Sequence, residues 1–317
     1  MAKQRERGWP PDPEPLPVPV VDNHTHLDSI ADVLPDDEPP PSVAALLERA
    51  AAVGVDRMVQ VGCDLPAARW TDALLRGRPE PWATDAPTDD AVARLLGAVA
   101  IHPNEAVLHG GVHEVGPDGL EPDPRPHHAV TLDAAIAEIA EIARTNDRVR
   151  AIGETGLDLF RTGPRGAAVQ RESFRAHVAL AKELGLALQI HDRDAHAEVL
   201  DVLARDGAPE RTVFHCYSGD ADMARFCAEQ GWFLSFAGPV TFRANDELRA
   251  ALRAVPLEQV MVETDAPYLT PHPYRGRPNA PYVLPATVRT VAEVVGQPLD
   301  VVCERLAATS VAVYGAW

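Results

Sequence analysis

Two histidines one residue apart, His24 and His26, follow an apolar run at residues 18–21. Side chains two positions apart on a β-strand point to the same face. The two imidazoles would therefore project together from the end of this strand, with Asp22 behind them. Such a pair suits a metal ion. An isolated His-x-His also occurs in loops and as a hydrogen-bonded core feature, so the rest of the chain must decide between these interpretations.

Residues with metal-binding or acid–base chemistry follow five further apolar runs. They are His102 after residues 95–101, Glu154 after 149–152, His191 after 186–190, His215 after 212–214 and Asp265 after 260–262. A single histidine after a strand is usually a core or loop residue, but six coincidences at the same position argue for a shared site. Four neutral imidazoles and two carboxylates of this set suit two divalent cations of borderline softness.

The elements that must position these residues alternate between strand and helix along the chain. The expected strands are 18–21, 55–61, 95–101, 149–152, 186–190, 212–214, 232–236 and 260–262. The expected helices are 43–52, 132–143, 167–184, 195–203, 221–229, 246–254, 284–295 and 299–307. Near-continuous apolar strands that alternate with helices predict a parallel sheet. Eight such strands predict an α/β fold of the (β/α)8 TIM-barrel type, in which the active site lies at the carboxyl ends of the strands.

A bridging carboxylate can hold two metal ions about 3.5–4 Å apart, so that they generate a bound hydroxide and clamp the scissile group. Many related metal-dependent barrels use a carbamylated lysine as the bridge. The only lysines here are Lys3, in the N-terminal tail, and Lys182, within an expected helix. Glu154, at the end of the fourth strand, is therefore the expected bridge.

The stretches around these residues resemble the TatD family of metal-dependent hydrolases and deoxyribonucleases, within the amidohydrolase-like barrels. The resemblance covers residues 18–315 and rests on residues 21–28, 153–158, 170–174, 190–195, 214–219, 263–269 and 271–276. It implies hydrolysis of phosphodiester bonds in DNA, often exonucleolytic, supported by two divalent ions of Mg²⁺, Mn²⁺ or Zn²⁺.

The resemblance also implies how the ligands are shared between the two ions. One ion would be held by His24, His26, Glu154 and Asp265, and the second by Glu154, His191 and His215. Glu154 and Asp265 would be the catalytic carboxylates.

Further polar residues are candidates for supporting roles. His102 and Arg193 are expected to contact the substrate phosphate, since a guanidinium matches phosphate oxygens bidentately. The alternative for both is a structural ion pair or a capping role. Glu263 shares a strand face with Asp265 and would either orient a ligating imidazole or form a salt bridge at the rim. Tyr268 is a candidate for lining the cleft, as is Arg275.

The composition fits one large domain with a tail. Of 317 residues, 46% are hydrophobic, which is ample for a core. Residues 1–17 are rich in proline and charge and are expected to form a disordered N-terminal tail, with one TIM-barrel domain over residues 18–317. Residues 78–90 and 109–130 are expected to be long surface loops. The histidines of the second loop are expected to be solvated; they are His109, His113, His127 and His128.

Charge and cysteine content narrow the partners and the compartment. A formal net charge of -18 argues against a broad basic face for nucleic acid. The expected substrates are therefore DNA strand ends or a small phosphoester. Four widely spaced cysteines, without a secretory signal or a long apolar segment, predict a cytoplasmic protein with no membrane partner. No obligate protein partner is evident.

Two alternatives to a deoxyribonuclease stay open on the residues alone. The same barrel site could hydrolyse a small phosphoester, lactone or amide, because one fold supports many chemistries. The chain could also be a non-enzymatic metal-binding scaffold, which the full ligand set disfavours.

Overall fold

The computed structural model describes residues 8–34, 40–78 and 87–317. Its eight strands belong to one sheet in chain order, β1 to β8. The strands are β1 (Val20–Thr25), β2 (Val55–Gly62), β3 (Leu95–Val99), β4 (Val149–Asp158), β5 (Ala187–Arg193), β6 (Thr212–Phe214), β7 (Phe233–Phe236) and β8 (Val260–Val262). The pairs β1–β2, β3–β4, β4–β5, β5–β6 and β7–β8 are parallel. Parallel strands in chain order confirm the predicted (β/α)8 topology.

Helices separate the strands along the chain. They are α1 (Val43–Ala52), α2 (Leu65–Leu75), α3 (Asp89–Ala93), α4 (Pro103–His109), α5 (Leu132–Thr145), α6 (Pro164–Leu184), α7 (His196–Asp206), α8 (Ala221–Glu229), α9 (Asp246–Arg253), α10 (Pro285–Val295) and α11 (Leu299–Tyr314). Several begin at a side-chain cap, as where Ser42 Oγ accepts a hydrogen bond from the N–H of Ala45. Two of them end at a left-handed glycine: α6 at Gly185 with φ 62°, and α10 at Gly296 with φ 67°.

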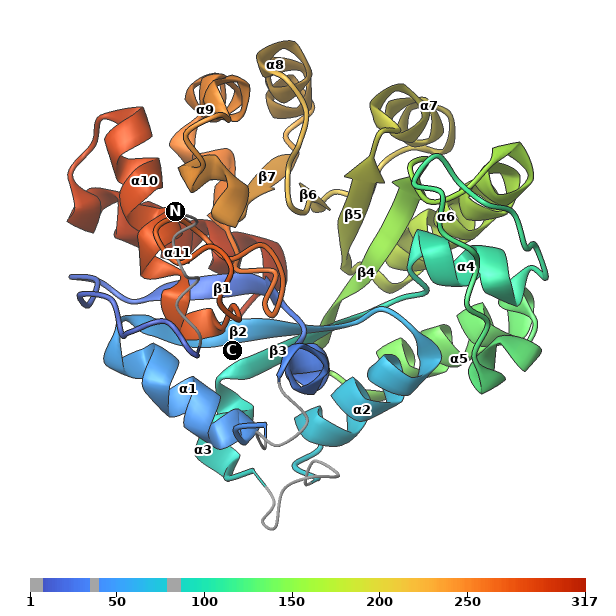
Figure 1. Cartoon of the computed structure of the whole chain (residues 1–317), viewed down its shortest axis with the longest axis horizontal. Helices are drawn as coiled ribbons and strands as arrows, with labels where there is room; N and C mark the ends of the chain where they lie inside the picture. The colour runs from blue at the N-terminus through green and yellow to red at the C-terminus, as the bar shows by residue number, and fades with distance from the viewer. Residues whose placement is uncertain (1–7, 35–39, 79–86) are drawn as a thin grey trace, which may run out of the picture. The chain divides into compact units, whose positions relative to one another are not determined.

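The chain divides into two compact units. Unit 1 comprises residues 1–60, 77–96 and 219–317, and unit 2 comprises residues 61–76 and 97–218. Within unit 2, β4 lies between its parallel neighbours β3 and β5 and packs against α6 (Figure 1). The consecutive strand residues Ala151 and Ile152 of β4, and Ala187 and Leu188 of β5, are fully buried, so this part of the sheet is core on both faces.

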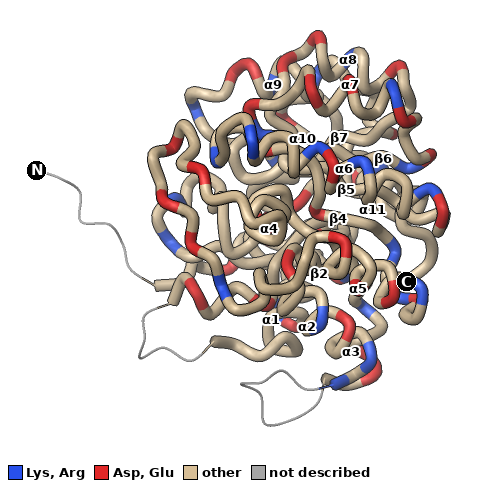
Figure 2. Tube along the Cα trace, turned by 90° about the vertical axis from the view of Figure 1, so that its right-hand side faces the viewer, with Lys and Arg blue, Asp and Glu red and all other residues tan. Residues whose placement is uncertain are grey.

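Within unit 1, α11 packs against β1 and β8, and α8 packs against α9. Acidic and basic residues are interleaved along α8 and α9 (Figure 2). Arg225 pairs with Asp222 on α8, and Arg249 pairs with Asp246 on α9 at 2.6 Å. Arg225 and Arg249 are thus each matched by a carboxylate one turn away.

The N-terminal segment differs from its prediction. Residues 8–17 are described, and they pack within unit 1 instead of forming a disordered tail. Leu16 is buried, and its N–H donates to the carbonyl of Val53 at 3.0 Å. The carbonyl of Pro10 accepts from Tyr282 Oη at 2.7 Å. A proline-rich chain has few backbone donors, but its carbonyls still accept hydrogen bonds, and that is how this segment is held. Residues 1–7 lie outside the described residues.

The two predicted loops have different outcomes. Residues 79–86 of the first lie outside the described part of the chain, and α3 begins shortly after them. The second loop begins at His109, which is the last residue of α4, and it contains a short 3-10 helix, η2 (Pro126–Ala129). His113 is exposed as predicted, but the prediction of solvation is wrong for His109, which is buried, and for His127 and His128, which contact Glu105.

The four cysteines, Cys63, Cys216, Cys227 and Cys303, are free. Across the described ranges, no helix has both the length and the apolar character needed to cross a bilayer.

Candidate metal centre

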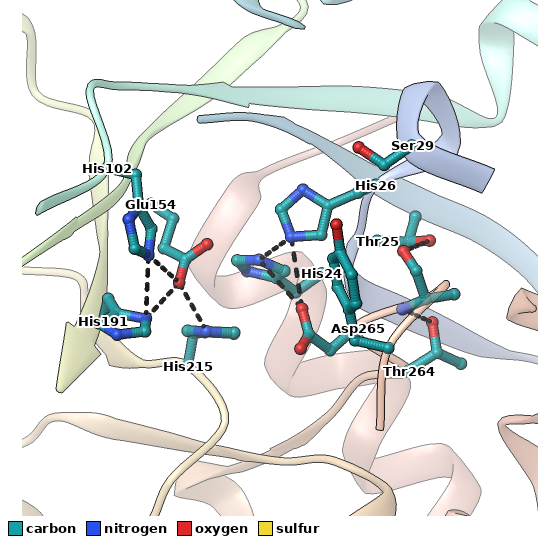
Figure 3. A network of polar contacts seen from close by, with 12 residues as sticks. His24, Thr25, His26, Ser29, His102, Glu154, His191, His215, Thr264 and Asp265 are labelled. Atoms are coloured by element: carbon teal, nitrogen blue, oxygen red, sulfur yellow. Dashed lines mark hydrogen bonds and ion pairs between the residues drawn. The ribbon is translucent and has the colours of Figure 1, made fainter. Parts of the chain in front are cut away.

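In unit 1, the end of β1 and the segment after β8 bring His24, His26 and Asp265 together (Figure 3). Nε2 of His24 lies 3.2 Å from Nε2 of His26. Oδ1 of Asp265 lies 3.3 Å from Nε2 of His26 and 3.8 Å from Nε2 of His24. All three residues are at most 9% exposed. The three atoms therefore converge on one point, as the sequence predicts for these residues.

Backbone and side-chain hydrogen bonds fix this arrangement. The N–H of Asp265 donates to the carbonyl of His24 at 2.9 Å, and the N–H of His26 donates to the carbonyl of Ala266 at 2.7 Å. The carboxylate of Asp22 accepts from the N–H of Thr264 at 2.9 Å and from its hydroxyl at 2.5 Å. Burial raises the pKa of Asp22 to about 7, against these hydrogen bonds, which lower it. Asp22 thus ties β1 to the segment that carries Asp265.

In unit 2, three imidazoles surround one oxygen of Glu154 (Figure 3). Oε1 of Glu154 lies 2.5 Å from Nδ1 of His191, 3.0 Å from Nε2 of His215 and 3.5 Å from Nε2 of His102. Glu154 is 4% exposed. Burial works to raise the pKa of this carboxyl, but the three imidazoles outweigh burial and hold the pKa well below its ordinary value. Glu154 is therefore ionised at neutral pH, as a metal ligand must be.

His191 is held from both sides. Its Nδ1 faces Glu154, and its Nε2 lies 3.3 Å from Oδ2 of Asp158 at the end of β4. Burial lowers the pKa of His191, but the two carboxylates outweigh it and raise the pKa to about 9. A ligating imidazole that donates its second N–H to a carboxylate is the usual pattern in metal sites. The Glu154 side of the ring is therefore the side for a metal.

His102 is placed differently from the other imidazoles. Its Nδ1 accepts a hydrogen bond from the N–H of Asn104 at 3.1 Å, as the cap of α4. A neutral imidazole has one N–H, so the proton of His102 is on Nε2. This Nε2–H can donate to a carboxylate or phosphate oxygen, but it cannot coordinate a metal while Nδ1 accepts. The contact with Glu154 therefore makes His102 a hydrogen-bond donor.

The group in unit 1 has nearly the spacing of a metal shell, whereas the group in unit 2 is closer, at hydrogen-bond distances. Metal–ligand bonds of about 2.0–2.2 Å in a tetrahedral shell place the ligand atoms about 3.3–3.6 Å apart. The nitrogen–oxygen distances in unit 1 are 3.3 and 3.8 Å. In unit 2 they are 2.5 and 3.0 Å to His191 and His215. Imidazole nitrogen with carboxylate oxygen is a donor set that suits borderline divalent ions. The residues thus fit the predicted metals.

The remaining predicted residues occupy varied positions. Arg193 is exposed at the end of β5, with its guanidinium 4.3 Å from the ring centroid of Phe160. Tyr268 lies edge-on to His26 at 6.0 Å between centroids, and Arg275 stacks on Phe242. Glu263 is fully buried, which favours an orienting role over a salt bridge at the rim.

Three residues that position this centre were not predicted. Asp158 belongs to the stretch at residues 153–158, and its spacing of four from Glu154 on a strand indicates a shared face. Gln170 on α6 accepts from the N–H of Asp158 at 2.9 Å and donates to its carbonyl at 3.2 Å. Gly156 has φ +147°, and a Cβ there would collide with the carbonyl oxygen of His191. Only the glycine lets β4 and β5 approach at the level of the ligands.

A family model described as TatD related DNase matches residues 21–315. A protein of Mycobacterium tuberculosis named uncharacterized metal-dependent hydrolase TatD is 44% identical over 282 residues, which are 88% of this chain and 91% of that protein. A 3'-5' ssDNA/RNA exonuclease TatD of Yersinia pseudotuberculosis is 37% identical over 174 residues, which are 53% of this chain and 66% of that protein.

The solved structure of YJJV, a TatD homologue from Escherichia coli K12, superposes with a TM-score of 0.70 at 22% identity. The match covers 93% of this chain and 97% of that one. This likeness confirms the fold. Because the family model spans almost the whole described barrel and the mycobacterial relative matches along its length, the chain belongs to the TatD family of metal-dependent hydrolases.

Proposed function

We propose that the chain is a metal-dependent deoxyribonuclease that hydrolyses phosphodiester bonds at DNA strand ends. The observation that carries this proposal is the pair of ligand groups, His24 with His26 and Asp265, and Glu154 with two imidazoles. The family description and the Yersinia relative named as a 3'-5' exonuclease support DNA as the substrate and a strand end as the point of attack.

We propose two divalent ions, of Mg²⁺, Mn²⁺ or Zn²⁺. His191 and His215 would hold one ion with Oε1 of Glu154. His24, His26 and Asp265 would hold the other, and Glu154 would be the ligand that the two ions share. When bound, the ions would activate a water molecule and neutralise charge on the scissile phosphate.

The side chains would divide the remaining work. Oδ1 of Asp265 faces the two imidazoles of unit 1. Its second oxygen, Oδ2, would accept the proton that the attacking water gives up. Nε2–H of His102 would donate to a non-bridging phosphate oxygen, a charge-assisted hydrogen bond. Arg193, exposed and held against Phe160, would bind a phosphate further along the strand.

The acidic net charge limits the length of DNA that the enzyme is proposed to contact. Two divalent cations with the carboxylates of Glu154 and Asp265 leave about +2 at the site. The attraction for phosphate would come from the ions, because the charge of the whole chain is -18. The enzyme would therefore engage a strand end at the ions without long contacts along a duplex.

A set of substrates with and without chelator tests the proposal. The substrates are linear single-stranded DNA, blunt duplex DNA, circular single-stranded DNA, bis(p-nitrophenyl) phosphate and p-nitrophenyl acetate. We expect linear DNA to be degraded, circular DNA to persist, and chelator to abolish the reaction. Glu154→Gln should lower kcat/KM roughly 1000-fold or more, since a metal ion contributes several kcal/mol. His113→Ala, an exposed histidine, is the matched control.

Each other result has a definite meaning. Equal degradation of circular and linear DNA contradicts attack at strand ends. Hydrolysis of p-nitrophenyl acetate, with none of the phosphodiesters cleaved, identifies a small-molecule hydrolase. Full activity of Glu154→Gln contradicts the bridging role.

A further inference from the structure

A second group of ligand-type side chains joins α4 to η2 within unit 2, and it shares no residue with the metal centre. Glu105 and His109 lie four residues apart on α4, and therefore on one face of that helix. His127 and His128 belong to η2. One ligand atom from each of the four residues lies within 4.8 Å of those of the other three.

The carboxylate of Glu105 is the centre of this group. Its Oε2 lies 3.1 Å from Nε2 of His127 and 2.7 Å from Nε2 of His128. Burial works to raise the pKa of Glu105, but the hydrogen bonds from the two imidazoles outweigh it and lower the pKa. Glu105 is therefore an ionised carboxylate in a half-buried position.

His109 contributes a nitrogen that is already prepared for a cation. Its Nδ1 donates to the carbonyl of Val130 at 2.7 Å, so the proton of the neutral ring is on Nδ1. Burial lowers the pKa of His109, which favours this neutral form. Its Nε2 is then a bare lone pair, fully buried, and it has no hydrogen-bond partner among the described residues. Such an unsatisfied buried acceptor destabilises the fold unless something binds it.

His128 has a different role. Its Nδ1 accepts a hydrogen bond from the N–H of Arg125 at 2.7 Å, so its proton is on Nε2. That Nε2–H donates to Glu105, and the ring cannot coordinate an ion through Nε2 without losing the bond to Arg125. His128 therefore orients the carboxylate, as partners of metal ligands commonly do.

We propose that Glu105, His109 and His127 form a second cation site, for a borderline divalent ion such as Zn²⁺, with His128 as the residue that positions Glu105. Two imidazole nitrogens and one carboxylate oxygen are a frequent zinc donor set. The distance of 3.1 Å between His127 and Glu105 is close to the spacing of about 3.3 Å expected in a tetrahedral shell.

The site goes beyond the hydrolase activity, because its effect is on the segment that carries η2. An ion here fastens residues 126–130 to α4, whose first residue follows His102. Glu105 is 25% exposed at its side chain and His127 is 15% exposed, so the ion can enter from solvent.

Metal counting on the full-length chain tests this site. The protein is stripped with chelator, equilibrated with Zn²⁺ and desalted, and bound zinc is measured by mass spectrometry. We expect His109→Phe and His127→Ala each to lose one equivalent relative to the wild type. His113→Ala, an exposed histidine of the same segment, should lose none. The same difference is expected when every protein carries Glu154→Gln, which separates this site from the proposed catalytic ions.

A second readout does not depend on counting. Zn²⁺ should raise the melting temperature of Glu154→Gln and should raise it less when His127→Ala is added. His127 is only half-buried, so this variant tests the site where His109→Phe fails to fold. Equal zinc content in the wild type, His127→Ala and His113→Ala overturns the proposal.

Discussion

Nε2 of His191 lies 3.3 Å from Oδ2 of Asp158. This ion-pair contact helps to orient the ring so that Nδ1 is directed at Glu154, and it would make the imidazole a better metal ligand. An asparagine at position 158 would keep one acceptor oxygen but could place an NH₂ group against the N–H of His191. We expect Asp158→Asn to weaken metal affinity about 10–100-fold while the fold is kept.

The measurement is a zinc or manganese titration followed by calorimetry. Asp192→Asn is a matched control, because Asp192 pairs with His196 at 2.8 Å and not with a predicted ligand. Unchanged affinity in Asp158→Asn, or an equal loss in both variants, would show that the carboxylate does not orient His191.

His102 is expected to act on the substrate and not on the metal, because its Nε2 carries the proton. A hydrogen bond to a charged group contributes about 1.5–3 kcal/mol, which corresponds to roughly 10–100-fold. His102→Phe should therefore lower kcat/KM for a phosphodiester by this factor while the metal content stays equal to that of the wild type. Steady-state kinetics and metal analysis on the same preparation check this. Loss of one equivalent of metal would instead make His102 a ligand.

The elements with strong apolar periodicity could be predicted closely from the sequence. The expected helices 43–52 and 221–229 coincide with α1 and α8, and the expected strands 212–214 and 260–262 coincide with β6 and β8. The helix α4 was missed. Pro103 follows a strand and suggests a break, but at the first position of a helix a proline is favourable, with His102 as the cap.

The types of residue in the candidate site could be predicted from the sequence, but the contacts that position them could not. The strand β4 was expected to end at Ile152, because Gly153 and Gly156 interrupt the apolar run, yet it continues to Asp158. Asp158 therefore acquired no role from the sequence. The burial of His109 follows from the packing of residues 126–130 against α4, which no local pattern records.

Gln170 is expected to contribute to stability through the end of β4. It is fully buried, and it satisfies both the N–H and the carbonyl of Asp158. Removing its amide leaves two buried backbone groups without partners, at about 1–3 kcal/mol each. Gln170→Ala should therefore lower the free energy of unfolding by about 2–4 kcal/mol, measured by urea denaturation. Glu172→Ala, at an exposed position of the same helix, should change it by less than about 0.5 kcal/mol. Equal losses would contradict this role.

His177 should make stability depend on pH. It is fully buried on α6, where its Nε2 accepts from the N–H of Ile101 at 3.2 Å and its Nδ1 donates to the carbonyl of Ser173 at 2.8 Å. Burial lowers the pKa of His177 from 6.5 to about 4, against the bond to Ser173. Between these two values the unfolded chain binds a proton that the folded chain does not. The contribution of His177 to the free energy of unfolding is therefore complete above pH 6.5. It falls by roughly 3 kcal/mol as the pH falls to 4.

Urea unfolding of the wild type and His177→Gln, in chelator and at several pH values, measures this contribution. Glutamine can still accept from Ile101 but does not titrate. The wild type should be more stable at pH 7, and its advantage should shrink by roughly 3 kcal/mol by pH 4. His113→Gln changes an exposed histidine and should show a nearly constant difference from the wild type. If the advantage of the wild type over His177→Gln is the same at pH 7 and pH 4, the buried ring is not kept neutral. In that case the hydrogen bond from Ile101, the residue before His102, would be the remaining reason for a histidine at position 177.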